Sequence, residues 1–269
     1  MATTRPIITL LTDFGEVDHF VGVMKGVILN IHSDVEIVDI SHSVSPQNIR
    51  QAGFLLSKVY PYFPPETIHV VVVDPGVGTD RKALLVSSEQ GYFIAPDNGV
   101  LSYVYQDVPV TEVREITADH YFLKPRSGTF DGRDVFAPVA AWLARGVSPS
   151  SFGEPVAEYA TCEISQPVAV KDGALRCEII HVDRFGNLVS NLSRERFEAE
   201  LANSKTTRFA FRIGEQTVST ISQAYQAAEP GELIAIFGSA GLLEFSINQG
   251  NAAASLSLGA GADFWLKVV

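Results

Sequence analysis

The feature that most limits the fold of this chain is a regular alternation of strand and helix patterns near its start. Residues 7–11, 35–40 and 67–73 are short apolar runs rich in β-branched side chains, which is the pattern of buried strands. Apolar residues recur at helical spacing over 20–31, and a second, mixed helical period covers 46–59, which opens with a proline. A strand-helix-strand-helix-strand order predicts a parallel sheet covered by helices.

The third strand pattern ends in a segment that carries an acid and a base. Asp74 follows the valine run 71–73, a Pro-Gly-Val-Gly sequence then breaks the strand, and Arg81 follows that turn. Because open α/β sheets bind ligands at the carboxyl ends of their strands, this carboxylate and guanidinium are candidates for a ligand site. An ion pair that only fixes the loop would have the same sequence, so both interpretations stay open here.

Beyond residue 81 the alternation stops, but acidic residues continue to occur at strand ends and in loops. Residues 83–88 and 92–95 predict a hairpin, and residues 135–145 predict a helix. Together the acidic positions predict a pocket for a ligand that is cationic or rich in hydroxyl groups. These positions are Asp13, Asp74, Asp97, Asp131 and Asp134.

A change of pattern predicts two domains. Residues 146–170 lack periodicity and contain several prolines and glycines, as a domain boundary does. We expect an α/β domain, with a mostly parallel sheet flanked by helices, over 1–165, and a smaller C-terminal β-barrel domain over 166–269. The second domain is predicted from short strands with glycine-rich turns, including a strand over 252–258. One helix is expected there, over 194–203.

The charge of the chain argues against two classes of partner. A formal net charge of −11 does not suit binding to nucleic acid or to an anionic membrane. No apolar stretch is long enough to cross a bilayer, and no signal-peptide pattern opens the sequence. The two cysteines, Cys162 and Cys177, suit a reducing compartment, so a cytoplasmic location is expected.

The sequence lacks the signatures of several cofactor-dependent or covalent mechanisms. Its six histidines have no spacing for joint metal ligation. It has neither a glycine-rich phosphate loop nor a Gly-x-Ser-x-Gly nucleophile motif. We therefore expect no metal and no cofactor, although a divalent-metal hydrolase that uses the many aspartates remains an alternative.

The C-terminal half contains one turn with chemically diverse side chains. A predicted strand ends in a segment that holds Asp183, Phe185 and Asn187, which can take an ammonium, a flat ring and a ring edge. A polar turn with Phe185 packed into the core would have the same sequence. Small-residue loops at 237–241 and 248–252 allow a ligand to approach the backbone, although hairpin turns have the same composition.

The order of these motifs resembles the S-adenosyl-L-methionine (SAM) hydroxide adenosyltransferases, which are adenosine-forming hydrolases related to bacterial fluorinase and chlorinase. This resemblance implies an N-terminal α/β domain, a C-terminal β-barrel and a homotrimer with sites between subunits. It also implies hydrolysis of SAM to adenosine and L-methionine by attack of water on C5′, without a cofactor. The motifs are Thr-Asp-Phe-Gly at 12–15, Asp-Pro-Gly-Val-Gly-Thr at 74–79, Pro-Asp-Asn-Gly at 96–99, Gly-Arg-Asp at 132–134, Asp-Arg-Phe-Gly-Asn at 183–187 and Asn-Gln-Gly-Asn-Ala at 248–252.

The resemblance also implies roles for individual residues. Asp74 and Arg81 match two of the three groups with which this family holds the attacking water. The residues implied to bind substrate are Asp13 for the ribose diol, Asp183 for the methionine ammonium, Phe185 and Asn187 for adenine, Ser239 for the methionine carboxylate, and Ala252 in the last motif.

The third group of the implied water site departs from the family pattern. This chain has Asp131 where the family usually has histidine, which makes Asp131 a candidate catalytic residue beside Asp74 and Arg81. A carboxylate near C5′ would repel fluoride or chloride, which argues against halide transfer. Two alternatives remain: a protein that binds SAM or adenosine with little turnover, and an Asp131 that only caps the helix after it.

Overall fold

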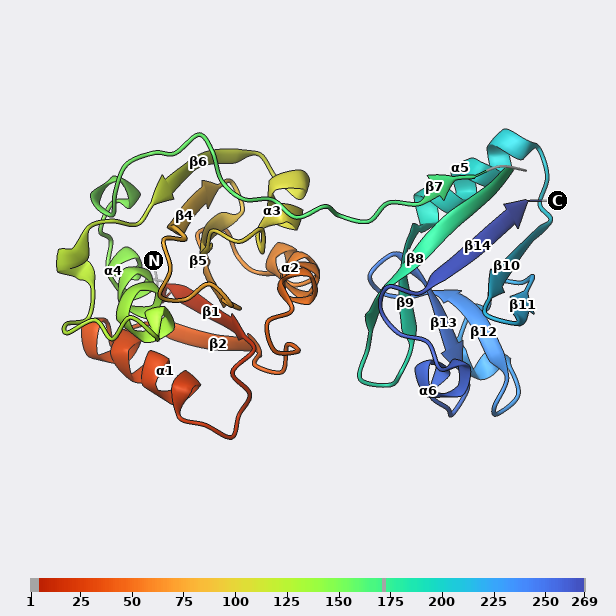
Figure 1. Ribbon diagram of the computed structural model, residues 1–269, viewed down its shortest axis with the longest axis horizontal. Helices are drawn as coiled ribbons and strands as arrows, with labels where there is room; N and C mark the ends of the chain where they lie inside the picture. Colours follow the sequence, from red (N-terminus) through yellow and green to blue (C-terminus); the bar gives the residue numbers. More distant parts are fainter. Residues whose placement is uncertain (1–4, 171–172, 269) are drawn as a thin grey trace. The chain divides into compact units, whose positions relative to one another are not determined.

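The computed structural model describes residues 5–170 and 173–268 (Figure 1). The chain divides into two compact units, Met1–Ile164 and Ser165–Val269, and each unit is described by itself. The N-terminal unit contains a mixed sheet flanked by helices, and the C-terminal unit contains an antiparallel, barrel-like sheet (Figure 1). These two architectures confirm the predicted fold class.

The N-terminal sheet has the strand order β2-β1-β3-β5-β4-β6. β1 pairs in parallel with β2 and β3, as the alternation predicts, and β5 adds a further parallel strand beside β3. β4 forms the predicted hairpin with β5, and β6 pairs antiparallel with β4 at the edge. The bounds are β1 (Ile7–Thr12), β2 (Glu36–Ser41), β3 (Ile68–Val72), β4 (Ala83–Ser88), β5 (Gly91–Pro96) and β6 (Val110–Glu115).

Helices cover both faces of this sheet, which explains why every residue of β3 is buried. α1 and α4 contribute to one apolar cluster, which includes Met24 and Val139, and α2 and α3 contribute to another, which includes Leu56 and Val104. The bounds are α1 (Phe20–Ile31), α2 (Ile49–Ser57), α3 (Ser102–Asp107), α4 (Ala137–Ala144), η1 (Tyr60–Tyr62), η2 (Asp119–Tyr121), η3 (Gly132–Phe136) and η4 (Pro149–Ser151).

Two helix starts differ from the sequence pattern for local reasons. α2 begins after the predicted start at Pro46, because the Asn48 side chain accepts a hydrogen bond from the Gln51 N–H group (3.0 Å) and caps the helix at Ile49. The predicted helix over 135–145 is present, but a π-helical turn, η3, precedes it. This turn fixes the position of the residue before it, Asp131.

A buried histidine lies within the N-terminal sheet. His69, on β3, is fully buried and stacks on Phe93 with ring centroids 5.1 Å apart. Its Nδ1 pairs with the Thr9 hydroxyl at 2.9 Å. Burial lowers the pKa of His69 from 6.5 to about 4, so this side chain stays neutral at a pH where an exposed histidine is charged.

The C-terminal sheet runs in the order β11-β10-β14-β8-β9-β13-β12, with β7 beside β8. Its pairings are antiparallel, and a bridge from Ile221 to Ala235 of β12 brings the two ends together, so that the sheet is nearly closed. The bounds are β7 (Val168–Ala169), β8 (Ala174–Val182), β9 (Leu188–Ser193), β10 (Phe209–Ile213), β11 (Gln216–Val218), β12 (Leu233–Phe237), β13 (Leu242–Ile247), β14 (Asp263–Val268), α5 (Arg194–Ser204), α6 (Ala252–Leu256) and η6 (Tyr225–Ala227).

The predicted strand over 252–258 is wrong, because this segment forms the short helix α6. The Asn251 side chain accepts a hydrogen bond from the Ala254 N–H group (2.8 Å) and caps the helix. A run of alanines favours the helix, and Ser257, in the left-handed region at φ 53°, ends it. The predicted helix over 194–203 is confirmed by α5.

Candidate active site

The loop after β3 places a carboxylate and a guanidinium in contact. Arg81 Nε donates to both oxygens of Asp74, at 3.0 and 2.9 Å, and Arg81 Nη2 also bonds to Asp74 Oδ2. The turn between them requires Gly78, which has φ +80° and lies so close to Gly128 that a Cβ would be 2.6 Å from its carbonyl oxygen. The Pro-Gly-Val-Gly sequence thus folds Arg81 back onto the end of β3.

Asp131 reaches the same guanidinium from a distant part of the sequence. Arg81 Nη2 donates to Asp131 Oδ2 at 2.6 Å, so Arg81 lies between two carboxylates. The side chains of Asp74 and Asp131 are only 5% and 1% exposed. Although Asp131 precedes η3, its side chain makes no capping hydrogen bond to that turn. The helix-cap interpretation of Asp131 is therefore wrong.

Arg81 is stabilised in its charged form. Burial opposes the charge, but hydrogen bonds to Asp74 and Asp131 outweigh burial and raise the pKa of Arg81 above its usual value. The guanidinium also lies over the Phe136 ring, with its central carbon 5.4 Å from the ring centroid. Arg81 can therefore hold carboxylates or stabilise an anion, but it cannot act as a base at neutral pH.

A second arginine, which belongs to no recognised motif, completes the cluster. Arg126 Nε donates to Asp131 Oδ1 at 3.0 Å, and Arg126 Nη2 donates to Asp131 Oδ2 at 2.9 Å. The Arg126 side chain is 48% exposed, and its guanidinium lies 6.0 Å from the centroid of the Phe122 ring. Asp74, Arg81, Asp131 and Arg126 thus form a row in which acidic and basic groups alternate.

The loop after β1 brings a third carboxylate to the same side of the sheet, at the carboxyl ends of its parallel strands. Asp13 Oδ2 accepts a hydrogen bond from the Gln47 N–H group at 2.7 Å. Next to it, the Thr12 hydroxyl pairs with His42 Nδ1 at 2.9 Å, and His42 Nε2 lies 3.0 Å from Asp39 Oδ1. The Gln47 N–H group is thus the partner that orients the Asp13 side chain, while Thr12, His42 and Asp39 contact one another beside it.

Asp13, Asp74 and Asp131 line one cavity of about 430 Å³. Arg81 does not belong to its lining and contacts the cavity through the carboxylates that it binds. A cavity that combines an apolar wall with a few convergent polar groups is the usual form of a small-molecule site. The predicted acidic pocket is therefore present, at the carboxyl ends of β1 and β3. Its aromatic wall consists of Phe14, Phe20 and Phe130.

Two of the predicted acidic positions stabilise loops instead. Asp97 Oδ1 accepts the Ala160 N–H group at 2.7 Å. Asp134 pairs with Arg133 at 2.6 Å and accepts from the N–H and hydroxyl groups of Ser127 at 2.6 and 2.7 Å. Burial opposes ionisation of Asp134, but these bonds outweigh burial and lower its pKa. Neither aspartate lines the cavity, so their expected place in the acidic pocket is wrong.

In the C-terminal unit, the turn after β8 is organised by Asp183. Its Oδ1 accepts the N–H groups of Phe185 and Asn187, at 2.9 and 2.8 Å, and its Oδ2 accepts the Asn187 side-chain amide at 2.8 Å. Phe185 is 75% exposed, so the interpretation that packs it into the core is wrong. An exposed ring beside a carboxylate provides a surface for a flat ligand or for another chain.

The start of α6 lies against this turn. The Ala253 N–H group donates to the Gly186 carbonyl at 2.9 Å, and a Cβ on Gly186 would lie 2.2 Å from the Asn251 side chain. Ala252, the first residue of α6, is fully buried. The structure thus brings Ala252 to the same place as Asp183, Phe185 and Asn187, although they are distant in sequence.

Ser239 lies in the turn between β12 and β13, next to the buried side chain of Glu244. A Cβ on Gly238 would lie 1.8 Å from Glu244 Oε1, so this carboxylate touches the turn. Glu244 accepts a hydrogen bond from the Tyr225 hydroxyl (3.2 Å), and burial, with a smaller contribution from the charge of Asp183, raises its pKa. Glu244 therefore touches the turn of Ser239 and is influenced by the charge of Asp183.

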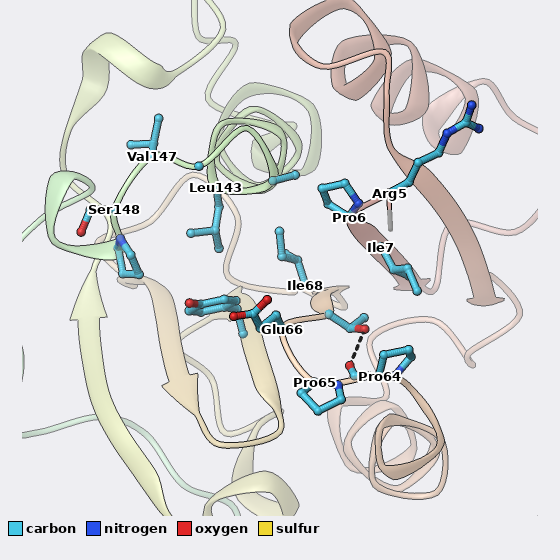
Figure 2. A pocket seen from close by; sticks show the side chains of 15 residues that line it. Arg5, Pro6, Ile7, Pro64, Pro65, Glu66, Ile68, Leu143, Val147 and Ser148 are labelled. Carbon is cyan, nitrogen blue, oxygen red and sulfur yellow. Dashed lines mark hydrogen bonds between the residues drawn. The ribbon is translucent and has the colours of Figure 1, made fainter. Parts of the chain in front are cut away.

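A second cavity, of about 470 Å³, lies at the amino ends of the strands of the N-terminal sheet (Figure 2). It is formed at the starts of β1 and β3 and by the segment after α4, and its wall includes Pro6, Pro64 and Val147. The Thr67 hydroxyl in this wall donates to the Pro64 carbonyl at 2.7 Å. Its lining includes none of the predicted site residues, so this cavity is not the candidate site.

Within residues 5–170 and 173–268, no three His, Cys, Asp or Glu side chains are arranged to hold a metal ion. Among the helices of these residues, none is long and apolar enough to cross a membrane.

Comparison with known families gives a match in each unit. Residues 8–153 match the SAM hydroxide adenosyltransferase N-terminal domain, and residues 177–265 match the C-terminal domain of the same family. The chain belongs to the SAM hydroxide adenosyltransferase family. The resemblance carried by the ordered sequence motifs is thereby confirmed.

Several relatives of this chain are similar to it over nearly their whole length. The (R)-S-adenosyl-L-methionine hydrolase of Methanocaldococcus jannaschii is 34% identical, over 94% of this chain and 92% of the relative. The fluorinase of Nocardia brasiliensis is 26% identical, over 100% of both chains. A crystal structure of an uncharacterized conserved protein from Thermotoga maritima has a TM-score of 0.88 and 38% identity, over 97% of this chain and 100% of that one.

Proposed function

We propose that this protein is an enzyme that hydrolyses SAM to adenosine and L-methionine. The observation that carries the proposal is that Asp74 and Asp131 line a partly aromatic cavity while Arg81 binds both of them. Family membership supports it, as do four relatives named (R)-S-adenosyl-L-methionine hydrolase at 32–34% identity. This arrangement suits an enzyme that holds a water molecule against a bound sulfonium nucleoside.

The proposed reaction requires a well-placed water molecule. Water attacks C5′ in line with the C5′–S bond, and the electron pair of that bond passes to sulfur, which leaves as the neutral thioether of methionine. The attacking oxygen becomes the 5′-hydroxyl group of adenosine and releases one proton. Because holding reactants in line can contribute about 7–11 kcal/mol, positioning would supply much of the rate increase.

In this proposal the water site consists of Asp74, Arg81 and Asp131. Asp74 accepts a hydrogen bond or the proton from the water, and Arg81 stabilises the negative charge that develops on its oxygen. Asp131 occupies the place of the histidine in the family pattern and is bound to Arg81 at 2.6 Å. No step of this scheme needs a metal or a redox cofactor.

Halide transfer, the chemistry suggested by the name of the fluorinase relatives, is less well supported. Asp13, Asp74 and Asp131 line the cavity whereas Arg81 and Arg126 lie outside the lining, so an entering anion would meet carboxylates before any cation. A neutral water molecule meets no such repulsion. We therefore assign water as the nucleophile.

The other assigned residues would bind the substrate. Asp13 lies in the acidic cavity and would hold the ribose diol, while the remaining groups lie in the C-terminal unit. We propose a homotrimer in which the C-terminal unit of a neighbouring subunit supplies the second half of each site. That half comprises Asp183 for the ammonium group, Phe185 and Asn187 for adenine, Ser239 for the carboxylate, and Ala252 at the start of α6.

The role of Asp13 predicts a loss of affinity in the variant Asp13→Ala. Hydrogen bonds to a charged group contribute about 1.5–3 kcal/mol, so the Kd for substrate should rise by up to about a hundredfold. The change in kcat should be smaller, because Asp13 is not part of the proposed water site. Calorimetric titration with a non-reacting SAM analogue measures the affinity directly.

The matched control is Asp18→Ala, which removes an exposed aspartate from the same loop. This control should bind the analogue as the wild type does. If Asp13→Ala also binds with unchanged affinity, the ribose is held elsewhere.

The division of the assigned residues between two units predicts that activity depends on assembly. Light scattering at micromolar protein concentration should give the mass of three chains. The exposed Phe185 suits this arrangement, because it would be covered by ligand and by the neighbouring subunit. A monomer with full activity would contradict the shared site.

The test of the proposed function is chromatographic detection of adenosine and methionine after incubation with SAM. Equal amounts of both products are expected, and EDTA should not change the rate. A protein that binds SAM but releases no adenosine would match the binding-protein alternative. Loss of activity in EDTA, with recovery on adding a divalent cation, would instead support a metal-dependent hydrolase.

A further inference from the structure

The acidic cluster contains a buried carboxylate whose charge Arg81 alone does not balance. Arg81 is shared between Asp74 and Asp131, so these three groups together carry one excess negative charge. Both carboxylates are at most 5% exposed, and leaving a buried charge without a partner is costly. Arg126 supplies the second positive charge and makes the row neutral.

The contact between Arg126 and Asp131 has the geometry of a specific interaction. Two nitrogens of the guanidinium donate to two different carboxylate oxygens, at 3.0 and 2.9 Å, which is the strong bidentate form of this pair. Arg126 is half exposed, whereas Asp131 is almost completely buried. The Arg126 side chain therefore extends from the surface and places its positive charge beside Asp131, which lines the cavity.

The loop that carries Arg126 is fixed to the element that carries Asp131. The Leu123 N–H group donates to the Asp134 carbonyl at 2.9 Å, and the Ser127 N–H group donates to the Asp134 side chain at 2.6 Å. These bonds hold the loop on both sides of Arg126. The position of the guanidinium is thus set by the fold as well as by its partner.

Other charged groups near Asp131 have different partners or the wrong sign. Arg133, two positions after Asp131, pairs with Asp134, and Asp13 and Asp74 add negative charge to the same cavity. Among the residues that the structure describes, Arg81 and Arg126 are the cations paired with Asp131.

We propose that Arg126 is a positioning residue of the water site: it balances the buried charge of Asp131 and holds this carboxylate in contact with Arg81. This inference rests on the proposed hydrolysis of SAM and adds to it a residue from outside the recognised motifs. Arg126 acts through Asp131 and lies outside the cavity lining. Through Asp131 it fixes the orientation of Arg81, which in turn contacts Asp74.

Removing the charge of Arg126 should change the pH dependence of the reaction. In Arg126→Met, the two carboxylates beside Arg81 would repel each other, and proton uptake by one of them would relieve the repulsion. The acid limb of the kcat profile should therefore move to higher pH by about one unit or more. At neutral pH kcat should fall about tenfold or more, while KM for SAM changes little.

The experiment compares adenosine release from pH 5 to 9 for the wild type, Arg126→Met and Arg126→Lys. Lysine keeps the charge without the bidentate fork, so it should restore the acid limb toward that of the wild type. Lys124→Ala is the matched control, because it removes an exposed cation of the same loop that pairs with Asp119. This control should have the wild-type profile.

A double-variant cycle separates positioning from a general effect on the fold. In the Asp131→Asn background there is no carboxylate for Arg126 to balance, so adding Arg126→Met should lower kcat much less than it does in the wild type. An equal loss of kcat in both backgrounds would overturn the proposal. So would pH profiles of Arg126→Met and wild type that superimpose.

The same proteins also give a readout that does not depend on catalysis. Thermal unfolding between pH 5 and 8 should show that Arg126→Met lowers Tm more at pH 8 than at pH 5, and that Asp131→Asn abolishes this difference. If the wild type releases no adenosine, the proposed function fails, while the unfolding cycle still decides whether Arg126 stabilises the buried Asp131 carboxylate. A Tm loss independent of pH would contradict the inference.

Discussion

Replacing Arg81 by alanine is expected to lower kcat by at least about a hundredfold, which is the loss typical of removing one group that stabilises transition-state charge. Arg81 donates hydrogen bonds to both Asp74 and Asp131, so its removal leaves two buried carboxylates without the cation between them. KM for SAM should change less than kcat, because Arg81 is outside the cavity lining. The measurement is steady-state adenosine release over a range of SAM concentrations.

A control variant and a check of folding make the Arg81 result interpretable. Arg145→Ala removes an exposed arginine after α4 and should leave both kinetic constants unchanged. Because Asp74 then has no cationic partner in the described part of the chain, although Arg126 still pairs with Asp131, the fold is also destabilised, and the Arg81→Ala protein should be assayed below its own Tm. A folded Arg81→Ala protein with wild-type kcat would show that Arg81 does not participate in the reaction.

Acid is expected to destabilise this protein through His69. The pKa of His69 is about 4 in the folded chain and 6.5 when exposed, so between these values the unfolded chain binds more protons. The free energy of unfolding should therefore fall as the pH drops from 6.5 to about 4, by about 3 kcal/mol in total from this residue. Above pH 6.5 the histidine should have no such effect.

The measurement is urea denaturation at pH 7 and pH 4.5 for the wild type and for His69→Asn. The variant loses packing against Phe93, so its stability at pH 7 should be lower. Its further loss on acidification should nevertheless be smaller than that of the wild type. His120→Asn, which changes an exposed histidine, should retain the wild-type dependence on pH. Equal acid losses in all three proteins would rule out the role of His69.

Much of the fold was predictable because its elements have strong local signals. β1 and β3 are apolar runs bounded by breakers, and α1 has a regular apolar period, so tertiary contacts reinforce what the sequence favours. α6 was mistaken for a strand because a five-residue helix shows little periodicity. Its start depends on the Asn251 cap, and its position depends on a contact with Gly186 that is remote in sequence.

The candidate site was predictable where a residue belonged to a motif at a strand end. Asp13 and Asp74 follow β1 and β3 directly, and both line the cavity. Arg126 and Glu244 could not be found in this way. Arg126 lies in an irregular loop and acquires its importance only through Asp131, and Glu244 is a single acid within the apolar strand β13.

A charged residue within an otherwise apolar strand is nevertheless a usable sequence signal. A buried carboxylate requires a partner, and the Tyr225 hydroxyl near Glu244 provides one. The loop that carries Arg126 has no comparable sequence signal, because exposed cations are common on protein surfaces. Only the bidentate contact with a buried acid distinguishes Arg126 from them.

The most direct test of the central claim is the fate of oxygen from the solvent. The enzyme should be incubated with SAM in water enriched in oxygen-18, and the products analysed by mass spectrometry. Attack of water on C5′ predicts adenosine with one heavy oxygen in its ribose fragment, and methionine without the label. Adenosine without the label, or no adenosine above the amount formed by Arg81→Ala, would contradict the proposed reaction.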